Sequence, residues 1–253
     1  LMPARTICGL MLAGLVVAQL PAQPPPLPPI GGNSSPAPKS ASPAAPANNS
    51  DVELVERVQE ARKQYITALR ELHKHYVQTG DTERAAWAQE ELLQYHRMSH
   101  PAYRLDLDVP SPKLQPLYNQ PEANRLYRDA MAWKDRGLGG DWGDNQRRAE
   151  VLLQRLLSEY PQSNKISDAA YQLGDIYEGR AFKQMARAAA YFERCFQWNP
   201  ATQFDARLRA ARLYDRELKN KVKALELYRM VREYETDPTR IQEADRRIAE
   251  LSR

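Results

Sequence analysis

The sequence predicts an all-α protein: a solenoid of about three helical hairpins, closed by a capping helix and preceded by a separate helical hairpin. Apolar residues recur at steps of three and four through most of the chain after residue 50, which is the spacing of a buried helix face. Small and aromatic residues return in the same order at offsets of 36 to 39 residues, as in stacked helix pairs. Prolines and glycines fall between the periodic segments, where helices end.

The first 20 residues have the pattern of a signal peptide. Arg5 gives a short basic start, and an apolar run of about eleven residues follows at positions 7–17. A run of that length is too short to span a bilayer as a stable helix. We therefore expect an exported protein that is periplasmic or associated with the cell envelope. An uncleaved N-terminal anchor is the alternative.

Residues 21–50 form a Pro/Ala/Ser-rich segment of low complexity. They contain ten of the nineteen prolines, and most of the others are alanine, serine, asparagine and glycine. Such a composition has little apolar surface to bury, so we expect a disordered or polyproline-like linker. Recognition of the proline tract by a partner is the alternative.

Residues 51–98 are predicted to form an antiparallel helical hairpin or coiled coil. Gly80 ends the first arm, and Asp81 or Thr82 can cap the second. Apolar residues mark one face of the first arm: Leu54, Val58, Ala61, Tyr65, Ala68, Leu69, Leu72 and Tyr76. The first arm is longer than the second, so part of this face lacks a partner within the hairpin. This excess predicts either a homo-oligomer through residues 51–98 or packing on the C-terminal domain.

Residues 99–121 are predicted to be a proline-containing linker. Five prolines interrupt any helix there, and positions 105–109 alternate apolar and acidic residues. That alternation is too short to predict a strand beside so many prolines. We expect an extended segment that lies along a helical surface.

Residues 122–253 contain the repeat. Equivalent positions align at offsets of 36, 37 or 39 residues: Gly174/Ala211, Tyr177/Tyr214, Ala188/Ala224, Phe192/Tyr228 and Ala149/Ala188. The small residues let two helices approach closely, and an aromatic side chain one turn later fills the space beside the contact. Phe192 and Tyr228 are expected to reach into the neighbouring pair. Pro161 and Pro200 are expected to follow the ends of second helices.

The middle segment, residues 167–200, resembles the tetratricopeptide (TPR) repeat. It contains the residues that this pattern requires: Leu173, Gly174, Tyr177, Ala188, Phe192 and Pro200. Residues 122–161 and 204–238 match less completely, and residues 240–252 resemble the helix that caps such arrays. The resemblance implies a TPR-like domain over residues 122–253 that binds other proteins or peptides and does not catalyse a reaction.

A narrower resemblance lies in residues 159–163 and 169–174, which look like exported bacterial TPR proteins. These are the Tol-Pal-associated coordinator CpoB/YbgF and the outer-membrane assembly lipoprotein BamD. BamD-like proteins carry a lipobox cysteine and more repeats, neither of which is evident here. The resemblance implies an exported cell-envelope scaffold that mediates protein-protein interaction through a TPR groove. The alternatives are a structural oligomer built on residues 51–98 and an accessory subunit of an envelope assembly or cell-wall enzyme complex.

The TPR resemblance also implies where a partner binds, because the first helix of each TPR pair lines a concave groove. By position, the groove side chains are Tyr127, Lys134, Asp168, Tyr171, Asp175, Arg212 and Asp215. Their mixed charges argue against a site that only clamps carboxylates. The alternative is that these side chains form solvated surface.

The sequence predicts no enzyme, cofactor site or metal site, because it contains no P-loop, GxSxG, HExxH or paired CxxC motif. Its 36 basic and 32 acidic residues do not predict nucleic-acid binding. Cys195 is expected in the core, and His96 and His100 are expected in solvent. Asp144, at the end of a glycine-rich loop, is expected to cap the helix that follows.

Overall fold

The computed structural model of the chain describes residues 51–98, 100–136, 139 and 141–253. The signal peptide expected over residues 1–20 and the linker expected over residues 21–50 lie outside the described residues. The described part of the chain is all-α and contains no β-strand, apart from an isolated bridge between Tyr118 and Ser163. None of the helices described is both long enough and apolar enough to cross a membrane.

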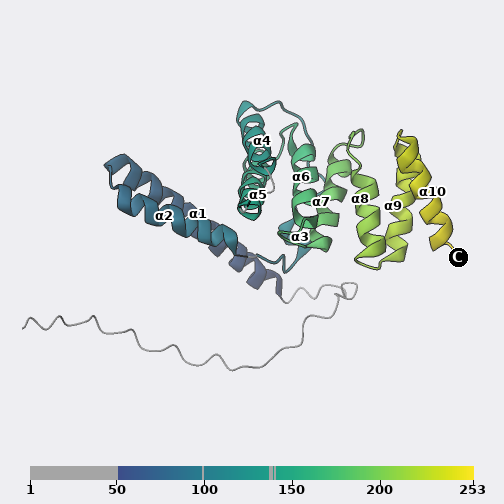
Figure 1. The fold of residues 1–253 in the computed structure, drawn as a ribbon, viewed down its shortest axis with the longest axis horizontal. Helices are drawn as coiled ribbons and strands as arrows, with labels where there is room; N and C mark the ends of the chain where they lie inside the picture. Colours follow the sequence, from purple (N-terminus) through teal and green to yellow (C-terminus); the bar gives the residue numbers. More distant parts are fainter. Residues whose placement is uncertain (1–50, 99, 137–138, 140) are drawn as a thin grey trace, which may run out of the picture. The chain divides into compact units, whose positions relative to one another are not determined.

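The described residues fold into α-helices, which are numbered in chain order. Their bounds are α1 (Val52–Thr79), α2 (Thr82–Arg97), α3 (Leu105–Asp108), α4 (Pro121–Lys134), α5 (Trp142–Glu159), α6 (Ile166–Glu178), α7 (Met185–Trp198), α8 (Ala206–Arg216), α9 (Lys221–Tyr234) and α10 (Pro238–Leu251). Helices α6 to α10 lie side by side in chain order (Figure 1).

Helices α1 and α2 pack together as a hairpin. Gly80 ends α1 with φ 76°, a left-handed conformation that glycine adopts without steric cost. The Asp81 carboxylate then accepts a hydrogen bond from the backbone N–H of Arg84 at 3.0 Å and caps α2. The side chains buried on the two helices are Val55, Ile66, Leu69, Ala85, Ala88 and Leu92. The hairpin therefore has a small apolar core of its own.

The hairpin is joined to the rest of the chain through a contact between α2 and α5. Arg97, at the end of α2, donates to one carboxylate oxygen of Asp144 at 2.9 and 3.1 Å. The prediction that Asp144 caps α5 is wrong, because α5 already begins at Trp142. Asp144 lies in the first turn, where a negative charge is favourable near the helix N-terminus, and there it binds Arg97.

The segment over residues 99–121 is not wholly extended, because it contains the single helical turn α3. Leu105 and Val109 are four residues apart, so the turn brings both onto the core that the later helices form. Val109 is buried there. The alternation of apolar and acidic residues suggested an extended segment, but the docking of these two side chains favours the turn.

Next to α3, the linker lies along α7, as its composition predicted. The guanidinium of Arg187 lies 2.6 Å from the carboxylate of Asp108, and Arg194 donates to the carbonyl of Pro110 at 2.6 Å. Both arginines are on α7. These two contacts hold the end of α3 against the helical surface.

Helices α4 to α9 form three consecutive pairs, α4–α5, α6–α7 and α8–α9, and α10 packs on α9. Each pair also contacts the next, through α5–α6 and α7–α8. The all-helical architecture is therefore repeat-like. The small and aromatic residues that recur in the sequence are fully buried within it: Ala149, Tyr177, Ala188, Phe192, Ala211, Ala224 and Tyr228.

Helices α6 and α7 approach each other closely at Gly174. A Cβ atom placed on Gly174 would lie 2.6 Å from the ring of Phe192. Phe192 also reaches the next pair, since its ring centroid lies 4.5 Å from the guanidinium carbon of Arg209 on α8. Tyr228 donates to Asp215 within its own pair and also interacts with Arg247 on α10, the helix that follows. Both aromatic residues therefore contact the next element, although for Tyr228 this is the single helix α10 rather than a further pair.

A candidate protein-binding face on the first helices of the pairs

The seven residues predicted to line a groove lie on α4, α6 and α8, the first helices of the three pairs. Five of them bond to a side chain on or beside the first helix of the next pair, or on α10. We call the side chains that join these helices the polar ladder: Lys134, Asp175, Glu178, Arg209, Arg212, Asp215, Glu243 and Arg247. The ladder connects α4 to α6, α6 to α8, and α8 to α10.

Asp175 on α6 is the centre of the first part of the ladder. Its carboxylate lies 2.6 Å from the ammonium of Lys134 and 2.7 Å from the guanidinium of Arg209. Arg209 also donates to Glu178 at 3.1 Å. Burial acts to raise the pKa of Asp175, but Lys134 and Arg209 together outweigh it and hold the pKa below its usual value. The carboxylate is therefore charged at neutral pH and links three helices.

The second part of the ladder joins α8 to α10. Arg212 donates to Glu243 at 2.8 Å, and this hydrogen bond is the main cause that lowers the pKa of Glu243. Asp215 accepts from Arg247 at 2.6 and 2.8 Å. Tyr228 on α9 donates to the same carboxylate at 3.1 Å. The last helix is thus held by ion pairs as well as by its apolar face.

Tyr171 joins α6 to the start of α8 without being charged. Its hydroxyl donates to the carboxylate of Asp205 at 2.7 Å, and its ring stacks on Phe204 with centroids 4.2 Å apart. Burial and the hydrogen bond to Asp205 raise the pKa of Tyr171 to about 12, although Arg209 acts in the opposite direction. The hydroxyl is therefore a neutral donor that fixes this ring in place.

Tyr127 and Asp168 lie two helical turns before Lys134 and Asp175 and do not belong to the ladder. Asp168 pairs with Lys165 at 2.9 Å. The ammonium of Lys165 lies 5.4 Å from the ring centroid of Tyr127. The structure thus divides the predicted residues into the ladder, a tyrosine contact and this smaller group, rather than bringing all seven together.

Four members of the ladder were not predicted from the sequence: Glu178, Arg209, Glu243 and Arg247. Two of them could have been found by helical spacing. Arg209 precedes Arg212 by three residues, and Glu178 follows Asp175 by three, so each shares a helix face with a predicted residue. Glu243 and Arg247 lie on α10, which the sequence indicated only as a cap.

Known proteins offer no functional assignment for the polar ladder. No known protein family, curated protein or solved structure matches this chain. A function therefore has to be inferred from the chemistry of the ladder and from the stacking of the helix pairs.

The polar ladder is electrically balanced, with four cationic and four carboxylate side chains. A ligand on this face meets groups that are already paired, so its own charges must share or exchange these ion pairs. In the part of the chain that the structure describes, no group of three or more His, Cys, Asp or Glu side chains is placed to hold a metal ion. This face can therefore bind a ligand through several hydrogen bonds and ion pairs at once.

Proposed function

We propose that this protein is an exported cell-envelope scaffold with a TPR-like repeat domain, which holds a protein or peptide along the polar ladder and does not catalyse a reaction. The observation that carries the proposal is the ladder itself. Side chains of both charges run across the first helices α4, α6 and α8 and across α10, and groups such as Asp175 and Arg212 keep about a third of their surface exposed. Export is proposed from the signal-peptide pattern of residues 1–20.

The resemblance of residues 167–200 to the TPR repeat supports this choice of face. In TPR proteins the first helices of the pairs line the groove in which a peptide or helix binds. Here the first helices α4, α6 and α8 also carry the ladder, together with α10. The side chains that can recognise a partner are therefore on the helices where the resemblance places the groove.

The charge balance of the ladder favours a protein partner over a polyanion. Nucleic acids bind to surfaces with an excess of lysine and arginine, because the binding energy comes largely from phosphate contacts. The ladder instead presents equal numbers of cations and carboxylates. Alternating charges of this kind select a partner with both signs and fix its register.

Site-specific photo-crosslinking tests whether this face binds a partner. Arg216 on α8 and Arg229 on α9 are both exposed arginines, and Arg216 lies at the edge of the ladder, 4.0 Å from Glu243. A photo-reactive residue at Arg216 should give a discrete adduct in cell-envelope extracts, whereas the same residue at Arg229 should not. Equal adducts from both positions, or none from Arg216, would argue against this face.

A double substitution, Tyr171→Phe with Asp175→Asn, tests whether the ladder residues make the interaction. It removes a hydroxyl and a charge but keeps the side-chain volumes, so the helices should stay folded by circular dichroism. The adduct from Arg216 should then be lost or strongly reduced. Arg229→Ala is the matched control and should leave the adduct unchanged. An unchanged adduct in the folded double variant would sink the assignment of these residues.

A further inference from the structure

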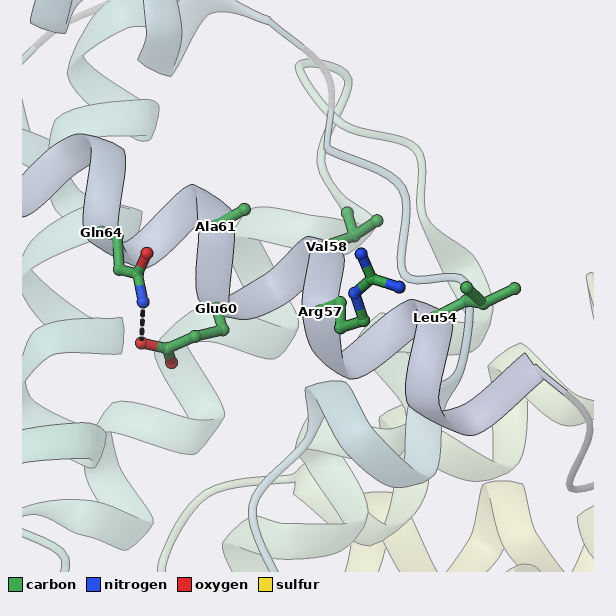
Figure 2. Close-up of a pocket in the computed structure, with 6 residues that line it drawn as sticks. All are labelled: Leu54, Arg57, Val58, Glu60, Ala61 and Gln64. Carbon is green, nitrogen blue, oxygen red and sulfur yellow. Dashed lines mark hydrogen bonds between the residues drawn. The ribbon is translucent and has the colours of Figure 1, made fainter.

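Helix α1 carries two stripes that each repeat at alternating steps of three and four residues. The inner stripe is buried or half-buried and faces the hairpin core: positions 52, 55, 59, 62, 66, 69, 73 and 76. The outer stripe is exposed at every position: Leu54, Val58, Ala61, Tyr65, Ala68 and Leu72. Figure 2 shows three of the outer side chains, Leu54, Val58 and Ala61, along one side of α1. Apart from Tyr65, whose ring centroid lies 5.6 Å from that of Tyr95 on α2, the outer stripe is a second apolar face that is exposed in the part of the chain that the structure describes.

The outer stripe is more apolar than the inner one that packs on α2. All six of its residues are apolar or aromatic, whereas the inner stripe includes Gln59, Arg62 and His73. Leu54 is 59% exposed and Leu72 is 42% exposed. The alternating spacing is that of a coiled-coil seam, and the distance along the helix from Leu54 to Leu72 is about 27 Å. An apolar stripe of this length is a docking surface rather than scattered surface leucines.

We propose that the outer stripe pairs antiparallel with the outer stripe of a second copy of this chain. In this register Leu54 faces Leu72 of the second copy. Val58 then faces Ala68, and Ala61 faces Tyr65, so a small side chain lies opposite a larger one in these layers. A parallel pairing would instead place Ala61 against Ala61 and Tyr65 against Tyr65, which leaves a gap in one layer and crowds the next.

The charges beside the outer stripe favour the same orientation. Arg57 and Glu71 flank the stripe, are exposed, and form no ion pair with another residue that the structure describes. An antiparallel pair places Arg57 of each copy opposite Glu71 of the other, once at each end of the seam. A parallel pair would place Arg57 near Arg62 of the second copy. The charges beside the outer stripe are therefore complementary between the two copies only when the helices are antiparallel.

The neighbouring helix extends this surface. Tyr65 of the stripe donates to Glu91 on α2, and Trp87 lies four residues before Glu91, on the same side of α2. Trp87 is 61% exposed. Because α1 is already folded against α2, the seam joins two preformed hairpins and does not require a free helix to order.

The oligomeric state of the full chain tests the proposal by sedimentation equilibrium over a range of concentrations. The wild type should be a concentration-dependent dimer. Leu72→Glu should make it monomeric without loss of helix content, since Leu72 is exposed within the monomer. Lys63→Glu, on an exposed position outside both stripes, is the matched control and should leave the dimer intact. A wild-type chain that stays monomeric at every concentration, or a dimer that Leu72→Glu does not affect, overturns the proposal.

Charge reversal tests the orientation. Arg57→Glu alone and Glu71→Arg alone should each weaken the dimer severalfold, and the two together should restore it. A dimer that Arg57→Glu strengthens, or that the double reversal fails to restore, overturns the antiparallel register. The described residues after position 50 belong to one compact unit, so the same measurement on residues 41–253 separates the seam from association through residues 1–40. A dimer that is lost without residues 1–40 contradicts the seam, as does a dimer that appears only after their removal.

Discussion

Single residues set the closest contacts of this fold, and Gly174 is the clearest case. The ring of Phe192 occupies the space in which any other residue at this position would place its Cβ atom. Phe192 is fully buried and also lies beside Arg209 of the next pair. The ring therefore has little room to move away, and the sequence pattern that pairs glycine with a later aromatic residue has a direct steric basis.

Gly174→Ala should lower the free energy of unfolding by about 1–3 kcal/mol, the usual cost of overpacking a core. The gain in helix propensity from glycine to alanine, about 1 kcal/mol, offsets part of this cost. Urea unfolding of the two proteins measures the difference. Gly139→Ala is the control, because a Cβ at Gly139 meets no atom within 4 Å. An unchanged or increased stability for Gly174→Ala would show that Phe192 adapts easily.

Two expectations about single side chains had different outcomes. Cys195 is buried in the core, as the repeat pattern predicted, and burial raises the pKa of its thiol to about 11. The expectation that His96 and His100 are solvated is wrong, because both are half-buried. His96 is on the last turn of α2, and Nε2–H of His100 donates a hydrogen bond to the carbonyl of Tyr95 at 3.0 Å. Their burial depends on packing that sequence spacing did not reveal.

At the scale of elements, the helices are joined by three kinds of contact. Within a pair, small and aromatic residues pack, as the sequence pattern predicts. Between the first helices of successive pairs, the polar ladder adds ion pairs. The hairpin α1–α2 is connected to α5 by a smaller contact that includes the Arg97–Asp144 ion pair. A polar side chain therefore accounts for a larger share of this junction than of the contacts within a pair.

Asp144→Ala should loosen this junction with little effect on global stability. Arg97 is about half exposed, and exposed ion pairs of this kind contribute little to stability. Amide hydrogen exchange in α2 should become faster, while the free energy of unfolding should hardly change. Asp129→Ala, which removes an exposed ion pair within α4, is the control and should leave α2 unaffected. Unchanged exchange in α2 would mean that apolar contacts alone hold the hairpin on α5.

For the whole molecule, the buried histidines couple stability to pH. Burial, with help from Arg70 and His100, lowers the pKa of His96 to about 4. The pKa of His100 is also lowered, chiefly by burial. An unfolded histidine binds a proton near pH 6.5, so between about pH 6.5 and 4 the unfolded state holds more protons. The two histidines therefore leave the free energy of unfolding unchanged above about pH 6.5 and lower it as the pH falls below that value.

Comparison with His96→Gln isolates this effect. Burial raises the pKa values of Asp108 and Glu150, and these carboxyls act in the opposite direction on acidification, but they are present in both proteins and cancel. The wild type should lose stability relative to His96→Gln as the pH is lowered from 7 to 4. Urea unfolding at several pH values measures the difference. A difference that does not vary with pH would show that His96 titrates normally in the folded state.

Most helices and the order in which they pair follow from local signals, namely periodic apolar residues and the prolines and glycines between them. Gly80 and Asp81 were predicted correctly in this way. The buried face of α1 was not, because Leu54, Val58 and Tyr65 of the predicted face are exposed, whereas Val55 and Ile66 are buried. The turn α3 was not, since its conformation depends on where Leu105 and Val109 dock. The same holds for Asp144, whose partner Arg97 is 47 residues away.

The candidate site was likewise predicted only in part from the sequence. Residues such as Asp175 and Arg212 could be placed on first helices from their spacing alone. That Asp175 pairs with both Lys134 and Arg209, and Arg212 with Glu243 on the last helix, became known from the packing of the helices. Residue spacing determines which face of a helix a side chain occupies, whereas its partner depends on how neighbouring helices pack against each other.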